Sequence, residues 1–196
     1  MLDEGMLSEI DSALRLLDRE LWVVTATDGQ RRGGLLATWV SPASIDRQRP
    51  VLLAALAPNH FTAELVLASK AFAAHLLLPT QVDVAWNFAS GTGRSRDKLA
   101  DLVVEQQLTG SPVLIDCLAW FDCRVFARYD AGDRIFLWGE VLAGGTRQRH
   151  AACLREQEFF QQLTAEQRQT LAADRESDVA LNRPRFDHWQ QRAAGA

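Results

Sequence analysis

The chain has 196 residues, of which 47% are apolar and 23% are charged, and its formal net charge at pH 7 is −4. The length suits one domain with a real core, and the composition excludes a disordered or fibrous chain. The negative charge argues against broad nucleic-acid binding, which needs a basic face. The longest apolar runs are far shorter than the roughly 20 residues of a membrane-spanning helix.

The cysteines and the N-terminal residues indicate the compartment. Cys117, Cys123 and Cys153 form no CxxC pair, which fits a reduced protein. We interpret Cys117 and Cys123 as small core residues. The first ten residues are acidic and lack the apolar stretch of a signal peptide, so we expect a cytoplasmic protein.

Strand and helix patterns alternate in the first half of the chain. Residues 8–20 carry apolar residues at helical spacing, with Ser8 as a possible N-cap, and predict an amphipathic helix. The β-rich run 21–27 ends at Asp28-Gly29, a strong hairpin signal. A second strand over 33–41 begins with two glycines, which permit a bulge or a close backbone approach.

The next elements follow one another closely. The pattern predicts a buried strand over 51–57, a helix over 61–70, a strand over 71–78 and a helix over 81–88. A Gly-rich basic loop over 89–98 then breaks the pattern, and 99–107 is typical of mixed helix and strand.

Two long strands, one from Leu118 and one over 134–144, pair antiparallel around a turn at 130–133. The last fifty residues are rich in Gln and charge at helical period, with a break at 182–184, and predict helices that lie over the barrel or a partner chain. Strands dominate, with helices between and after them, which favours a mainly β fold with a closed, Greek-key-like antiparallel sheet.

The predicted organisation has three parts. An N-terminal helix over 1–20 packs on a barrel domain over 21–146, and a helical extension covers 147–196.

The stretch from Thr25 to Thr62 is the most site-like part of the chain. Small and hydroxyl residues stand where strand packing prefers bulk, so that a ligand can approach the backbone: Ala37, Thr38, Ser41, Ala43 and Ser44. A helix then starts at Asn59-His60-Phe61-Thr62, and its free N–H groups and positive dipole end readily hold a phosphate. Together these features predict a site for a flat, phosphorylated cofactor.

Several enzyme signatures are absent from the sequence. It contains no GxSxG, GxxxxGK[ST] or HExxH motif, and its four histidines lack metal-ligand spacing. We therefore expect no bound metal.

Several segments, in order, carry a resemblance. They read GG-LLATW-VSPASI, P-VLLAALA-PNHFT, FAAHLLL, GRSRDKLA, GSPVL, AWFDCRV and GDRIFLWGEV, and they cover about residues 20–145. This series resembles the flavin reductase-like family of FMN-binding split barrels. The resemblance implies a split β-barrel, FMN as cofactor, hydride transfer from NAD(P)H to flavin N5, and a homodimer with the flavin near the subunit interface. It also implies that no catalytic residue is needed, because the flavin carries the chemistry.

The resemblance also implies a set of ring contacts. The segment Leu36-Ala37-Thr38-Trp39 matches the one along the isoalloxazine ring, where backbone N–H groups and the Thr38 hydroxyl bond the ring. Ser41 follows as a further hydroxyl of the same stretch. The alternative is an ordinary barrel strand.

The remaining contacts would be made to phosphate and ribityl. Asn59, His60 and Thr62 match the loop and helix start that take the phosphate, or they are ordinary helix-capping residues. His75 stands where the family often has asparagine on a strand lining the flavin, with a core histidine as the alternative. Cations in the matching GRDxDK loop would lie near phosphate or ribityl, with a solvated loop as the alternative: Arg94, Arg96 and Lys98.

The sequence also departs from the family pattern. Leu36 replaces a usual threonine, and residues 47–49 replace a tight DPP turn. Where relatives that reduce free flavin carry an H…GRY-like segment, this chain keeps only His150. A second hypothesis is therefore an FMN-binding electron-transfer module that a partner protein reduces, and a third is a split barrel that binds haem or pyridoxal phosphate.

Overall fold

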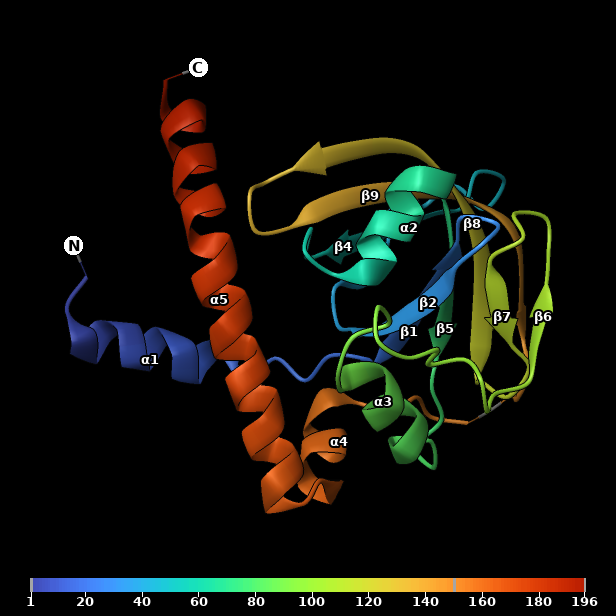
Figure 1. The fold of residues 1–196 in the computed structure, drawn as a ribbon, viewed down its shortest axis with the longest axis horizontal. Coiled ribbons are helices and arrows are strands. Elements are labelled where there is room, and N and C mark those ends of the chain that lie inside the picture. Colours follow the sequence, from blue (N-terminus) through green and yellow to red (C-terminus); the bar gives the residue numbers. More distant parts are fainter. Residues whose placement is uncertain (1, 150, 196) are drawn as a thin grey trace.

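A curled antiparallel sheet forms the body of the protein in the computed structural model, which describes residues 2–149 and 151–195 (Figure 1). Seven strands follow one another in the order β2-β1-β5-β8-β9-β4-β3. They are β1 (Trp22–Thr27), β2 (Arg32–Ala37), β3 (Val40–Pro42), β4 (Val51–Leu56), β5 (Ala71–Leu76), β8 (Ala119–Asp130) and β9 (Ile135–Thr146). The mainly β split-barrel prediction is confirmed.

A two-stranded sheet and several helices surround this barrel. The small sheet pairs β6 (Val104–Gln106) with β7 (Pro112–Leu114). The helices are α1 (Glu4–Leu14), α2 (Phe61–Ser69), α3 (Val82–Ala89), α4 (Glu156–Gln162) and α5 (Ala165–Ala194). Figure 1 shows α5 running along one side of the barrel and α1 pointing away from it.

The β1–β2 hairpin forms at the predicted turn. Gly29 has a φ of +91°, which glycine adopts without steric cost. The Asp28 carboxylate accepts hydrogen bonds from the backbone of Gln30 at 3.0 Å and of Arg31 at 2.7 Å. These bonds and the Arg31 guanidinium lower the pKa of Asp28 to about 2. The carboxylate therefore stays ionised, and can accept these bonds, over the physiological pH range.

The strand predicted over 33–41 is interrupted at Thr38-Trp39. Residues before the interruption belong to β2 and residues after it to β3, which lie at opposite ends of the sheet order. At the corner, the Trp39 carbonyl accepts a bond from the Ala55 backbone at 2.9 Å. The corner therefore carries the chain from one edge of the split barrel to the other.

The N-terminal helix differs from its predicted bounds. It begins after Asp3, whose carboxylate caps it by accepting a bond from the Met6 backbone at 2.8 Å, and not after Ser8. No residue of α1 is buried within the described chain, although the sequence predicted that the helix packs on the barrel. Its apolar side chains reach solvent instead.

Two other local predictions are wrong. Residues 99–107 form turns and the short strand β6, without a helix. The predicted break at 182–184 is also wrong, because α5 continues through Pro184. A proline inside a helix removes one backbone hydrogen bond, but contacts with the barrel hold α5 on both sides of it: Asn182 bonds Asn59, and Arg185 bonds the Gly132 carbonyl.

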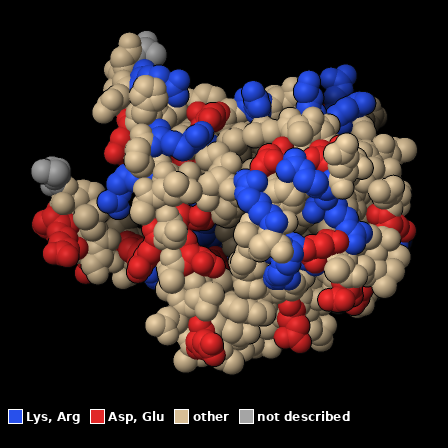
Figure 2. Space-filling model, viewed as in Figure 1, with Lys and Arg blue, Asp and Glu red and all other residues tan. Residues whose placement is uncertain are grey.

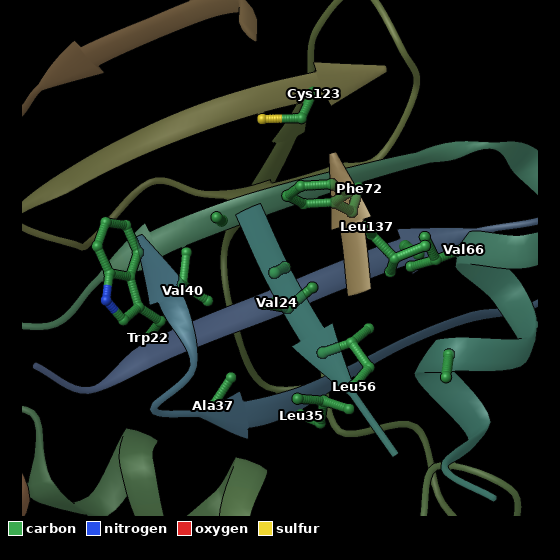
Figure 3. Close-up of a cluster of buried hydrophobic side chains, with 14 of the residues drawn as sticks. Trp22, Val24, Leu35, Ala37, Val40, Leu56, Val66, Phe72, Cys123 and Leu137 are labelled. Atoms are coloured by element: carbon green, nitrogen blue, oxygen red, sulfur yellow. The ribbon is translucent and has the colours of Figure 1, made fainter. Parts of the chain in front are cut away.

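The core divides into two clusters on the two faces of the sheet. Figure 3 shows the first, in which Phe72 of β5 lies near Cys123 of β8 and Leu137 of β9. Phe72 is fully buried. Cys117 and Cys123 are free and buried, as predicted, and burial raises the pKa of both thiols, that of Cys117 to about 11.

Candidate functional site

A cavity of about 810 Å³ lies between the barrel and α5. Figure 2 shows a hollow here, with acidic side chains on its α5 side and basic side chains toward the barrel. The barrel wall consists of β2, the start of α2 and the loop after α3, while α5 closes the opposite side. Its volume falls within the roughly 300–1,000 Å³ that is typical of small-molecule sites.

The β2–β3 corner forms the apolar part of this wall. Leu36 and Trp39 line the large cavity, and Ala37 and Thr38 line a smaller one of about 110 Å³ that shares Leu36 and Trp39. The Trp39 indole is 43% exposed and lies against the guanidinium of Arg134, 5.3 Å from the ring centroid. The corner thus offers a partly exposed indole, packed against Arg134 and stacked on Phe136, with backbone polar groups beside it.

The start of α2 forms the polar part. His60 occupies the N-cap position, but its side chain makes no cap hydrogen bond. Asn59, His60 and the buried Thr62 all line the cavity. Because the first N–H groups of a helix lack partners within the helix, this end attracts an anion.

One buried cation faces the same space. Lys98 is only 5% exposed, and its Nζ donates a hydrogen bond to the Phe88 carbonyl at 2.9 Å. Burial, and secondarily the nearby Arg96, lowers the pKa of Lys98 to about 8. Its charge is therefore poorly compensated by water and favours an anionic ligand.

Four residues predicted for the site line neither this cavity nor the smaller one beside it. Ser41 is exposed on β3, where its hydroxyl donates a bond to the Pro42 carbonyl. Arg94 and Arg96 border a separate open hollow and bond Glu64 and Asn87, respectively.

His75 is the fourth, and it is a core residue. Its Nδ1 lies 2.9 Å from the Val23 carbonyl, and its Nε2 lies 3.1 Å from the Leu114 backbone nitrogen. An N–H at Nδ1 therefore donates to Val23, while Nε2 accepts from Leu114. Desolvation lowers the pKa of His75 to about 4, which keeps the ring neutral. His75 is therefore a core histidine with both ring nitrogens hydrogen-bonded, which is the alternative that the sequence left open.

Sequence reasoning missed the α5 side of the cavity. The residues that α5 contributes include Asp174, Arg175, Asp178, Asn182, Arg183 and Phe186. The helical period of this segment indicated a helix, but its polar residues are spread around the axis, so no face could be assigned to the barrel. The one available signal, the Asn182-Arg183-Pro184 cluster, suggested a break instead.

Asp178 makes the central contact across the cavity. Its carboxylate accepts a bond from Asn59 Nδ2 at 2.8 Å and lies 2.8 Å from His60 Nε2. Asn182, which is 2% exposed, donates to Asn59 Oδ1 at 3.0 Å. The side chains predicted to hold a phosphate are thus brought together, and they are engaged by the carboxylate of α5.

The arrangement fits a planar, phosphorylated ligand. An aromatic, apolar corner and an uncapped helix start with a buried lysine form neighbouring parts of the barrel wall. Among the described residues that line the cavity, no side chain is placed as a nucleophile beside a base. The cavity is therefore suited to hold a cofactor that carries its own chemistry.

Comparison with known proteins gives a consistent result. A family model of the flavin reductase like domain matches residues 14–163. Diflavin flavoprotein A 1 of Synechocystis sp. is 26% identical over 138 residues, which make up 70% of this chain and 24% of that protein. The chain thus spans about a quarter of the length of this relative.

Two solved structures share the fold. The NADH:FAD oxidoreductase of Streptomyces globisporus superimposes with a TM-score of 0.69 at 19% identity, over 79% of this chain and 90% of its own. An FMN-binding protein from Thermus thermophilus superimposes with a TM-score of 0.61 at 23% identity, over 66% and 71%. At this identity the likeness concerns the fold alone.

Proposed function

The chain belongs to the flavin reductase like domain family, and from that membership we propose that it binds FMN between the barrel and α5 and accepts a hydride from NAD(P)H. The observation that carries the proposal is the meeting of two distant segments in one cavity. The corner at Leu36–Trp39 and the helix start at Asn59–Thr62 both line it. An NADH:FAD oxidoreductase and an FMN-binding protein among the structural neighbours support flavin as the ligand.

The chain's own residues would position the cofactor. Trp39 and Leu36 offer apolar faces to a ring, and the Thr38 hydroxyl offers a hydrogen bond at its edge. The α2 start with Asn59 and Thr62 would hold the phosphate, because helix N-termini bind anions. Bound FMN would supply a hydride acceptor at N5.

A second candidate is an electron-transfer module without its own nicotinamide site. The position of α5 favours it, because this helix lines the side of the cavity opposite the barrel wall and so takes up space that a nicotinamide beside the flavin would need. His150, the residue retained from the nicotinamide-side segment of relatives, lies outside the described residues.

The purified protein tests both candidates. We expect the visible absorption of flavin to stay with the protein after addition of FMN and removal of unbound FMN by gel filtration, and to be bleached under anaerobic NADH or NADPH. Binding without bleaching would support the module reduced by a partner protein. A haem or pyridoxal phosphate spectrum in the protein as purified would contradict the flavin proposal.

Substitutions in the corner and the helix start should separate ring contacts from phosphate contacts. Asn59→Ala is expected to weaken FMN binding about tenfold and riboflavin binding much less, since a hydrogen bond to a charged group contributes about 1.5–3 kcal/mol. Thr38→Ala should weaken both flavins about threefold to tenfold. Titration calorimetry measures each Kd.

Ser41→Ala is the matched control for this series. Its hydroxyl belongs to the same sequence stretch but lies outside the cavity, so its Kd values should equal those of the unaltered protein. Full FMN affinity in both the Asn59 and Thr38 variants would refute the assignment.

We also propose that the protein is a cytoplasmic homodimer. Support for a second copy comes from the apolar side chains of α1, which are exposed within the described chain: Met6, Leu7, Ile10, Leu14 and others beside them. In the part of the chain that the structure describes, none of the helices combines the length and apolarity needed to cross a bilayer. Light scattering should give twice the chain mass of 21.8 kDa, and Ile10→Asp should shift the mass toward one chain.

A further inference from the structure

The α5 carboxylate of Asp178 contacts side chains that the proposed function assigns to a ligand phosphate. It bonds Asn59 Nδ2 at 2.8 Å and lies 2.8 Å from His60 Nε2, directly at the start of α2. A carboxylate at a helix N-terminus is favourable for the same reason as a phosphate there, because both meet the positive dipole end. Two anions at this point would repel each other.

The attachment of α5 is largely polar, although Leu171 packs partly buried against the second core cluster. Asn182 is the single buried residue among those described in this helix. Beyond it, Arg185 Nε donates to the Gly132 carbonyl at 3.0 Å, and Trp189 donates to the Tyr129 hydroxyl at 3.0 Å. Polar contacts of this kind can exchange for water when the helix moves, so displacing α5 costs far less than opening the core.

The same contact contains an unsatisfied polar atom. Asn182 is 2% exposed, and its Oδ1 is buried without a hydrogen-bond partner, although its Nδ2 bonds both Asn59 and the Asp178 carbonyl. An unpaired buried acceptor destabilises the arrangement that contains it. Asp178 is thus one of several polar contacts, with Arg185 and Trp189, that hold α5 in its docked position, and the unpaired acceptor of Asn182 lowers the stability of that position.

We propose that Asp178 competes with the phosphate of a flavin for the α2 start, so that it sets the selectivity between phosphorylated and unphosphorylated flavins and couples phosphate binding to release of α5. This proposal rests on the flavin function above. FMN must displace the Asp178 carboxylate, whereas riboflavin can occupy the Trp39 corner with α5 still docked.

Removal of one charge tests the selectivity. Asp178→Asn is expected to tighten FMN binding about tenfold, the order of a partly exposed charge interaction, and to change riboflavin binding less than threefold. Glu176→Gln is the matched control, because it makes the same charge change on α5 and its side chain does not line the cavity. An unchanged or lowered ratio of FMN to riboflavin affinity in Asp178→Asn would overturn the proposal.

A second measurement needs no variant, and it compares inorganic phosphate with FMN. Hydrogen exchange of the α5 backbone should speed up in the unaltered protein when inorganic phosphate replaces chloride at equal ionic strength. If phosphate speeds up exchange in α5 and no flavin binds, the competition between Asp178 and phosphate is supported and the proposed flavin function is wrong. If FMN binds while neither FMN nor phosphate changes α5 exchange, the flavin function stands and the competition is wrong.

Discussion

Replacing Phe72 by alanine is expected to lower the free energy of unfolding by about 3–5 kcal/mol, the usual cost of deleting a buried phenyl ring. Phe72 is fully buried within the cluster shown in Figure 3. Its ring fills the space above Gly139 of β9, where an added Cβ would lie 2.8 Å from the ring. The surrounding sheet is held by pairing on both sides and cannot collapse fully into the vacated volume.

The Gly139 contact makes this prediction more specific. Gly139→Ala should itself cost about 1–3 kcal/mol through overpacking against the Phe72 ring and the Cβ of Cys123. Phe72→Leu shortens the side chain, so the double variant should lose less stability than the two single losses added. Urea denaturation gives each value. Phe126→Ala is the control, because this phenylalanine of β8 is 61% exposed; its free energy of unfolding should stay within about 0.5 kcal/mol of that of the unaltered protein. Strict additivity of the Phe72 and Gly139 losses would contradict the packing described.

A second large effect concerns the pH dependence of stability through His75. Its pKa of about 4 in the folded protein lies below the ordinary 6.5, so the unfolded chain binds the proton more readily. The contribution of His75 to the free energy of unfolding is fully present above pH 6.5 and is lost as the pH drops toward 4. The full loss from this residue amounts to about 3 kcal/mol.

His75→Asn should remove this pH dependence. At pH 7 the variant is expected to be about 2–3 kcal/mol less stable, because a buried backbone group loses its partner. Its stability should then fall less steeply between pH 6.5 and 4, so that the two curves converge near pH 4. Denaturation at a series of pH values measures this, and His188→Asn, on the exposed surface of α5, should leave the curve unchanged. Parallel curves for His75→Asn and the unaltered protein would argue against a neutral, buried ring.

Local signals predicted much of the barrel. Asp28-Gly29 specifies its turn through φ and side-chain bonds that lie within a few residues. The start of α2 was predicted for a similar reason, since an apolar strand followed by polar residues marks a helix beginning. Such features depend on neighbours in the sequence, and they also supplied the helix-start half of the candidate site.

Features that depend on distant contacts were not predictable in this way. The break at Thr38-Trp39 arises because the chain must pass between the two edges of the split barrel, and no turn residue marks it. Pro184 predicts a helix end by local rules, but contacts of Asn182 and Arg185 with the barrel override it. The pairing of Asp178 with Asn59 joins residues 119 positions apart, which no periodicity can reveal.

The length of α5 has a mechanical consequence. At about 1.5 Å per residue, its thirty residues form a rod of about 45 Å, and the contact with Asn59 lies near the middle. Small rotations of the helix are therefore amplified at its ends. A tilt of about 10° about Asp178 would move Ala165 through about 3 Å, given the rise of about 1.5 Å per residue. A pair of spectroscopic labels, one at an end of α5 and the other on the barrel, would convert an event at one carboxylate into a measurable change of distance.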